Sequence, residues 1–317
     1  MRMFFGPVTD QPSWHWVGAD VARRLAERND IRYFQTLDEI PDGSLVFWIK
    51  HPGSERMAAD IRRRRIVLLF FPVDCFADEC HIARHRAFID AASTVCLHAR
   101  GLAPYFPAAR IAWVDHYNKY GVAHAARSPG RSVLWIGAYQ YLPYLVYGLC
   151  QLARRPREIG VLTDHSCPRA QAAAARHAEK IGMPDFARRL DGLGVVMRAW
   201  SVPAQRDALL TCAAAFDYKF TDCFNQRHKP PTKIQKYLCS GIPCAINPQV
   251  PFQEQLGVDL GTLEELDRLV LDSGNAEAAA ARAEDLSSRL ALGRIASAYE
   301  AIAHRAAGQG TAAWQPE

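Results

Sequence analysis

The chain has 317 residues, which is long for one globular core and comfortable for two domains. About half of the residues (49%) are apolar and 22% are charged, the ordinary balance of a folded protein, and the net charge of +5 is too mild to indicate nucleic-acid binding. No apolar run approaches the roughly 20 residues of a membrane span, the N-terminal apolar stretch is too short for a secretory signal, and the nine cysteines lack the spacing of a disulfide framework. We therefore expect a cytoplasmic protein with reduced thiols.

Strand-like and helix-like segments alternate in the first third of the chain. The apolar run Met3–Val8 opens the series, and strands are expected at Asp30–Gln35, Ser44–Lys50, Ile66–Phe71, Thr94–His98 and Arg110–Val114. Helices are expected between them at Val17–Arg28, Ser54–Arg64 and Ala77–Ala92. Such alternation predicts βαβ units and a mostly parallel sheet.

The pattern breaks over residues 118–131, where the sequence is polar and carries Gly and Pro, and it restarts at Ser132. We predict an N-terminal domain over 1–122, a linker over 123–131 and a second α/β domain over 132–290. A C-terminal helix in 291–317 is expected to return toward the first domain, with a loose tail at Gly308–Glu317.

The most informative stretch is HKPPTKIQKYLCSGIPCAIN, residues 228–247. Pro230 and Pro231 forbid a helix before Thr232, whose hydroxyl is expected to cap the helix that follows. Gly241 suits the left-handed position that ends a helix, and Pro243 suits the start of the next strand.

Cations gather at this predicted helix. No acidic residue lies between Asp222 and Glu254, while the first half of that interval carries Arg227, Lys229, Lys233 and Lys236. A helix N-terminus beside several cations, at the carboxyl end of parallel strands, is a place where phosphate binds. The alternative is a solvated basic face.

The same stretch resembles the C-terminal-domain signature of GT-B glycosyltransferases, in which P-x-K-x-x-E-Y-x-x-x-G-x-P-V follows an "aDv.l.P" strand. Here PTKIQKYLCSGIPCAI takes the first role and AAFDYKFT the second, while SVLWIG and RIAWVD resemble the opening of the donor domain and the approach to the interdomain linker. The resemblance implies an α/β protein of two Rossmann-like domains that face each other across a cleft, with the last helix crossing back. It also implies sugar transfer from a nucleotide sugar, with UDP or GDP expected and the identity of the nucleotide left open. No metal or other cofactor is expected if the protein's own cations neutralise the diphosphate.

The resemblance further implies a donor site in the second domain. The family's Glu is replaced by Lys236, a second family Glu by His228, and no cation follows Gly137, so phosphate neutralisation is assigned to Lys233, Lys236 and Arg227. The implied donor-binding residues are Gly137, Tyr139, Gln140, Trp200, Asp222, Arg227, His228, Thr232, Lys233 and Lys236.

Two residues of the first domain are candidate bases for the acceptor proton. Asp74 follows the buried strand Ile66–Phe71, and His15 lies in the first strand-to-helix loop. The alternatives are that Asp74 caps the next helix and that the His15 loop simply packs. His116 and Asn118 are assigned to the hinge.

Several alternatives stay open. Cys75, Cys80, His81 and His85 form a rival metal constellation, although their spacing matches no common zinc pattern. The run Arg62–Arg65 is interpreted as a solvated helix end, and the alternatives are contact with acidic lipid head groups at the inner face of a membrane or with a polyanionic acceptor such as DNA. The acceptor is left open as a glycan, a lipid-linked compound or a small molecule, and the rival functions are a non-catalytic nucleotide-sugar binding protein and a DNA-modifying glycosyltransferase.

Overall fold

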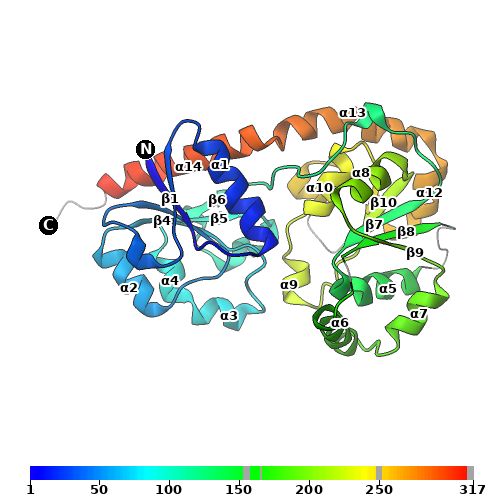
Figure 1. The fold of residues 1–317 in the computed structure, drawn as a ribbon, viewed down its shortest axis with the longest axis horizontal. Helices are drawn as coiled ribbons and strands as arrows, with labels where there is room; N and C mark the ends of the chain where they lie inside the picture. The colour runs from blue at the N-terminus through cyan, green and yellow to red at the C-terminus, as the bar shows by residue number, and fades with distance from the viewer. Residues whose placement is uncertain (153–157, 165, 248–251, 313–317) are drawn as a thin grey trace. The chain divides into compact units, whose positions relative to one another are not determined.

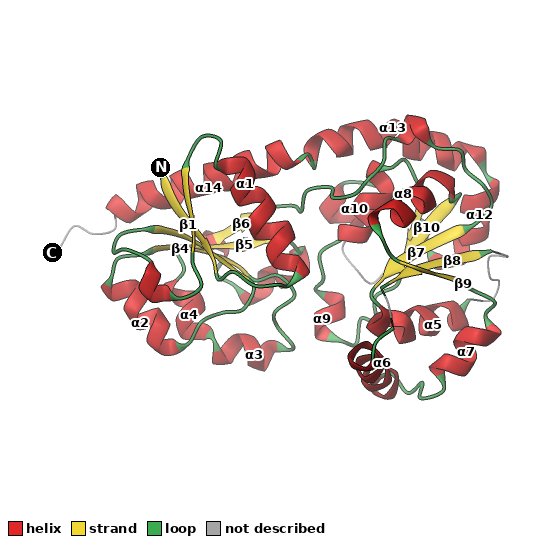
Figure 2. Ribbon diagram, viewed as in Figure 1, coloured by secondary structure: helices red, strands yellow, loops and turns green. Residues whose placement is uncertain are grey.

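The computed structural model describes residues 1–152, 158–164, 166–247 and 252–312. The chain divides into two compact units, and each unit is built from segments that are not contiguous in the sequence. Unit 1 comprises Met1–Tyr117, Asp222–Pro230 and Arg289–Glu317, and unit 2 comprises Asn118–Thr221 and Pro231–Ser288. Helices and strands alternate in both units (Figure 2).

Unit 1 is built on a six-stranded parallel sheet with the strand order β2-β1-β3-β4-β5-β6. Its strands are β1 (Arg2–Gly6), β2 (Asp30–Tyr33), β3 (Leu45–Ile49), β4 (Val67–Phe71), β5 (Thr94–Leu97) and β6 (Ile111–Trp113). Its helices are η1 (Trp14–Ala19, a π-helix), α1 (Asp20–Leu25), α2 (Glu55–Arg63), α3 (Glu79–Arg84), α4 (Arg86–Ala91), α9 (Phe224–Arg227) and α14 (Leu292–Ala312), with short 3-10 turns at Leu37–Glu39, Arg100–Tyr105 and Ala108–Arg110. Every residue of β3 is buried, as expected for a central strand covered on both faces.

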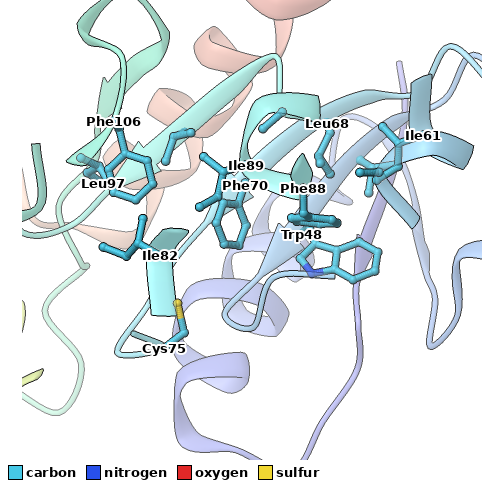
Figure 3. Packing of buried hydrophobic residues seen from close by; sticks show 14 of the residues in the cluster. Trp48, Ile61, Leu68, Phe70, Cys75, Ile82, Phe88, Ile89, Leu97 and Phe106 are labelled. Carbon is cyan, nitrogen blue, oxygen red and sulfur yellow. The ribbon is translucent and has the colours of Figure 1, made fainter. Parts of the chain in front are cut away.

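Aromatic side chains form much of the core on one face of this sheet. The ring centroid of Phe88 lies 5.1 Å from that of Trp48 and 5.5 Å from that of Phe70 (Figure 3). The C-terminal helix α14 covers part of the other face, where it packs against α1 and β4 (Figure 1). Its Tyr299 stacks on Phe71 with ring centroids 4.7 Å apart, so the predicted return of the last helix to the first domain is seen in unit 1.

Unit 2 is built on a five-stranded parallel sheet with the order β11-β10-β7-β8-β9. Its strands are β7 (Val133–Gly137), β8 (Ile159–Thr163), β9 (Val196–Ala199), β10 (Ala214–Asp217) and β11 (Cys244–Ile246). Its helices are α5 (Leu142–Gln151), α6 (Pro168–Lys180), α7 (Phe186–Gly192), α8 (Val202–Thr211), α10 (Thr232–Cys239), α11 (Phe252–Leu256), α12 (Leu266–Leu271) and α13 (Ser273–Arg289), with 3-10 turns at His124–Ala126, Tyr139–Tyr141 and Leu263–Glu265. The predicted class, α/β with two Rossmann-like halves, is confirmed.

The segment over 123–131, expected to be a linker, packs on unit 2. The Arg127 guanidinium donates to the backbone carbonyls of Leu209, Cys212 and Gly241. The Tyr120 carbonyl accepts from Gln205 Nε2 at 3.0 Å, which anchors the start of the same segment. Hydrogen bonds of this kind, which join residues far apart in the chain, cannot be recognised from a polar, Gly-containing sequence.

Several local expectations need correction. The helix predicted over 77–92 is broken at His85 into α3 and α4. The segment AAFDYKFT, which resembles the family's strand, is a strand only as far as Asp217. Thr232 does not cap α10, because the helix begins at Thr232 itself and Pro231 occupies the N-cap position without a side-chain bond. Gly241 does end α10 in the left-handed region, at φ +67°.

Helix α14 continues to Ala312, so it includes the first part of the expected loose tail, and residues 313–317 lie outside the described residues. In the part of the chain that the structure describes, no helix combines the length and the apolar character that a bilayer span requires.

Candidate functional site

The strand order of unit 2 reverses between β7 and β10. The chain passes from β7 to β8 and β9 on one side, and β10 and β11 lie on the other. In open α/β sheets, ligands bind outside the carboxyl ends of the strands at this switch point. The loops that begin at Ala138 and at Tyr218 leave the sheet there, so this edge is the first place to look for a site.

An ionic cluster occupies the switch point. Asp217, the last residue of β10, is 1% exposed, and its carboxylate lies 2.7 Å from Lys219 Nζ and 3.0 Å from Lys233 Nζ. Burial alone would raise the pKa of Asp217, but the two ammonium groups outweigh it and hold the pKa below its usual value. Two ammonium groups therefore share one ionised carboxylate.

Lys233 is further placed by an aromatic ring. Its Nζ lies 4.3 Å from the centroid of the Trp135 indole, a cation–π contact. The Lys233 side chain is 22% exposed, whereas that of Lys219 is 6% exposed. Lys233 is thus the member of the cluster that solvent, and hence a ligand, reaches most readily.

The backbone at Lys219 is clamped by Asn247. Asn247 Oδ1 accepts from the Lys219 N–H at 2.9 Å, and Asn247 Nδ2 donates to the Lys219 carbonyl at 2.9 Å. An amide that satisfies both backbone groups of one residue takes the place of a sheet partner beyond the end of β10. The backbone of Lys219 is therefore held in place through both its N–H and its carbonyl.

The N-terminus of α10 lies next to this cluster in the chain, since Lys233 is its second residue. Pro231 occupies the N-cap position of α10 and makes no side-chain hydrogen bond to the first turn, and the positive end of the helix dipole lies there. Together with Lys219 and Lys233, this arrangement can neutralise and orient a phosphate group.

Lys236 is not part of a solvated basic face. It is 7% exposed, and its Nζ donates to Gln205 Oε1 at 3.0 Å. Gln205 Oε1 also accepts from Trp200 Nε1 at 2.9 Å, so Trp200 and Lys236 meet on one buried amide. Burial lowers the pKa of Lys236 to about 8. These contacts give both residues a structural task, and their assignment to donor binding stays a prediction.

Three further predicted donor residues lie at the end of β7 and in the turn after it. The Tyr139 N–H donates to the Asp164 carboxylate, which follows β8 at the same edge of the sheet. Gln140 and Tyr139 are half-buried, and Gly137 lies beside the ring of Trp135. The predicted residues Gly137, Tyr139 and Lys233 thus come from elements that end or begin at the switch point.

Asp222, Arg227 and His228 were expected in the second domain, but they belong to unit 1. Asp222 and Arg227 are exposed there, and His228 is half-buried with its ring 4.3 Å from that of Phe224. These residues lie in unit 1 because Phe224, their neighbour in the chain, packs in the apolar core of that unit.

Asp74 lies in unit 1, in the loop after β4, and is exposed. It adopts the left-handed region at φ +49°, which is uncommon for a residue with a side chain. It does not cap α3, since Asp78 does so by accepting from the His81 N–H at 2.6 Å. A small pocket beside it is lined by Pro72, Cys75, Phe76, Phe224, Asn225 and His228.

His15 is exposed on the π-helix η1, and a π-helical turn is often found at functional sites. The next residue, Trp16, turns inward, donates from Nε1 to the Tyr117 carbonyl at 2.9 Å and packs on the ring of His116. Unit 1 therefore contains Asp74 in the loop after β4 and His15 in the π-helical turn that follows β1.

Two buried histidines of unit 1 form a pair that could not be predicted from the sequence. His98 and His116 follow β5 and β6, are 4% and 5% exposed, and lie edge to face with ring centroids 4.2 Å apart. Neither ring nitrogen of His116 has a hydrogen-bond partner among the described residues. Burial lowers the pKa of His116 to about 3 and that of His98 well below its usual value.

The rival metal constellation is not assembled. Cys75 is buried and Cys80 is exposed, while the rings of His81 and His85 lie 5.1 Å apart. Across the described ranges of the chain, no group of three or more His, Cys, Asp or Glu side chains is placed to hold a metal ion.

The fold of the chain is that of GT-B glycosyltransferases. No protein-family model matches it, and no curated protein matches its sequence. It is similar in structure to an α,α-trehalose-phosphate synthase (UDP-forming) from Burkholderia vietnamiensis, with a TM-score of 0.57 at 10% identity over 90% of this chain and 76% of that chain.

Two further solved structures agree. The trehalose-6-phosphate synthase of Burkholderia multivorans gives a TM-score of 0.56 at 9% identity, over 94% of this chain and 76% of that chain. The N-terminal domain of trehalose-6-phosphate phosphatase from Candida albicans gives 0.53 at 9% identity, over 90% and 72%. At such low identity the likeness establishes the fold, and the chemistry has to be argued from the site.

Proposed function

We propose that the protein is a nucleotide-sugar-dependent glycosyltransferase, with the donor on unit 2 and the acceptor on unit 1. The observation that carries the proposal is the ionic cluster of Asp217, Lys219 and Lys233 at the switch point of a GT-B fold. The half-buried ammonium of Lys233 and the positive end of the α10 dipole suit the diphosphate of a nucleotide sugar. The similar trehalose-phosphate synthase is described as UDP-forming, which makes UDP the first nucleotide to test.

In this proposal, the two lysines and the start of α10 stabilise the negative charge that develops on the diphosphate as its bond to the sugar breaks. Such stabilisation by fixed cations requires no metal ion. Asp74 is the candidate base that takes the proton from the attacking acceptor hydroxyl, and His15 is its rival. Closing the site against water protects the donor from hydrolysis.

The proposal is tested by a thermal-shift screen with UDP, GDP, ADP, CMP and TDP. A nucleotide that binds only the folded protein, present at 100 times its Kd, stabilises it by about 2.7 kcal/mol. We expect a shift with one or two nucleoside diphosphates and a smaller shift with CMP, which carries one phosphate. If none of the five changes the melting temperature, unit 2 is not a nucleotide site.

A second candidate, non-catalytic binding of a nucleotide sugar, is favoured by one observation. The family's Glu is replaced by Lys236, and Lys236 is buried on Gln205. A protein of this kind would bind the nucleotide sugar and release no nucleotide from it. Measuring nucleotide release from the preferred donor, with mixed glycan, lipid-linked and small hydroxyl acceptors, separates the two candidates.

A further inference from the structure

The segment Asp222–Pro230 leaves unit 2 after β10, packs as part of unit 1 and returns to unit 2 before α10. Phe224 anchors it, since this ring is 8% exposed and belongs to the apolar core of unit 1. The centroid of the Phe224 ring lies 5.3 Å from that of Tyr105 and 4.3 Å from that of His228. The segment is therefore held in unit 1 by buried aromatic contacts.

Asn225 connects this segment to the loop of the candidate base. Its Nδ2 lies 3.5 Å from the Asp74 carbonyl oxygen and 3.5 Å from that of Phe76, two long hydrogen bonds that bracket the turn. Asp74 is held at φ +49°, a conformation that persists in residues with side chains when the surroundings support it. The Asn225 amide supplies part of that support.

His228 fixes the other end of the segment. A Cβ on Gly101 would come within 2.6 Å of His228 Nδ1, so the missing side chain of Gly101 makes room for the imidazole. Three residues separate His228 from Thr232, where α10 begins, and two of them are Pro230 and Pro231. Two consecutive prolines form a stiff connection, because their φ angles are fixed.

We propose that Asp222–Pro230 is a coupling element, in which Asn225 positions the Asp74 loop and the two prolines transmit a displacement of α10 to that loop. The inference rests on the proposed function in one respect, namely that the ligand of α10 is the nucleotide donor. Donor binding beside Lys233 then orders the loop that carries the candidate base. The coupling is reciprocal, so a loop held in place also favours donor binding.

The positioning role is tested without any ligand, by hydrogen–deuterium exchange of the full-length protein. In Asn225→Ala, we expect the amides of residues 73–78 to exchange about fivefold faster, as loss of a weak hydrogen bond implies. The amides of β1, β3 and β4 should keep their parent rates. Asp222→Asn, an exposed change in the same segment, is the matched control and should leave both regions unchanged. Unaltered exchange at 73–78 in Asn225→Ala, or acceleration spread equally over the strands of unit 1, overturns the positioning role.

The coupling is tested by repeating the exchange with saturating UDP, GDP, ADP, CDP or TDP. In the parent protein, the nucleotide that binds should slow exchange at the start of α10 and also at residues 73–78. In the double variant Pro230→Gly/Pro231→Gly, protection of α10 should remain and protection of 73–78 should be lost. Protection of α10 without a loop response in the parent, or a loop response that survives in the double variant, overturns the coupling alone. If none of the five nucleotides protects α10, the proposed function fails and the coupling fails with it.

Discussion

The indole of Trp135 lies where a side chain on Gly137 would have to be. A Cβ on Gly137 would come within 2.2 Å of the Trp135 ring, and the same ring carries the ammonium of Lys233 at 4.3 Å. The glycine that ends β7 therefore shapes the cation site indirectly, through the ring that it admits. This differs from the usual argument for a glycine near a phosphate, which is close approach of the backbone.

Gly137→Ala should therefore destabilise unit 2 and weaken nucleotide binding. Trp135 is 2% exposed and cannot move without disturbing the core, so we expect a loss of about 1–3 kcal/mol, as in other overpacked cores. Gly192→Ala is the control, because a Cβ there meets open space at the end of a helix. Urea denaturation of both variants checks the prediction, and a Gly137→Ala protein as stable as the Gly192→Ala control contradicts it.

Asp217→Asn should be severely destabilising. It leaves two ammonium groups without their shared carboxylate at a buried site, and breaking a buried ion pair typically costs about 3–5 kcal/mol. The ion pair of half-buried Asp60 with exposed Arg63 on the surface of α2 supplies the control, and Asp60→Asn should be nearly silent. Because the folded pKa of Asp217 is lowered, its contribution is present above its ordinary value of 3.8 and is lost as the pH falls through the folded value. Chemical denaturation at pH 7 and pH 3 should therefore show a smaller difference in the free energy of unfolding between parent and variant at pH 3.

Lys236→Met should change how stability depends on alkaline pH. The folded pKa of Lys236 is about 8 against an ordinary value of 10.5, so the unfolded chain binds more protons between these values. Parent stability should consequently gain a contribution as the pH rises from about 8 to 10, and the variant should lack that gain. Denaturation at pH 7, 8, 9 and 10 measures it. Parallel curves for the two proteins would show that Lys236 is not a buried cation.

His116→Phe should make unit 1 less sensitive to acid. The folded pKa of His116 is about 3 against an ordinary value of 6.5, so the parent loses stability as the pH falls from about 6.5 toward 3. The variant keeps an aromatic ring against Trp16 and removes one of the two buried titrating rings, which leaves His98 to account for the remainder. Thermal melts from pH 7 to pH 4 check the prediction. An equally steep loss of stability in the variant contradicts it.

The order of strands and helices could be predicted because each unit alternates buried strands such as Val67–Phe71 with amphipathic helices such as Glu55–Arg63. The placement of Asp222–Pro230 could not, because a single ring, Phe224, decides which unit the segment joins. Helix α7 could not be predicted for a related reason, since only Leu190 of its seven residues is buried and no apolar stripe marks it.

The candidate site was predictable in part. The sequence pattern led to Lys233 and to the start of α10, but the pairing of Lys233 with Asp217 depends on two elements 16 residues apart. Lys219 was missed, although an acid at the end of a buried strand followed by a lysine, as in Asp217-Tyr218-Lys219, was a visible signal for it. The burial of Lys236 follows from its contact with Gln205 across 31 residues, which no local pattern reveals.

Calorimetric titration of the parent and of Lys233→Ala with the preferred nucleoside diphosphate tests the central claim most directly. Removing one charge-assisted contact to phosphate should cost about 1.5–3 kcal/mol, or roughly ten- to a hundredfold in affinity. Lys219→Ala should weaken binding as well, while Arg188→Ala, whose side chain is 83% exposed on α7, should bind like the parent. If Lys233→Ala binds the nucleotide as tightly as the parent does, the cluster around Asp217 is not the donor site and the proposed function loses its main support.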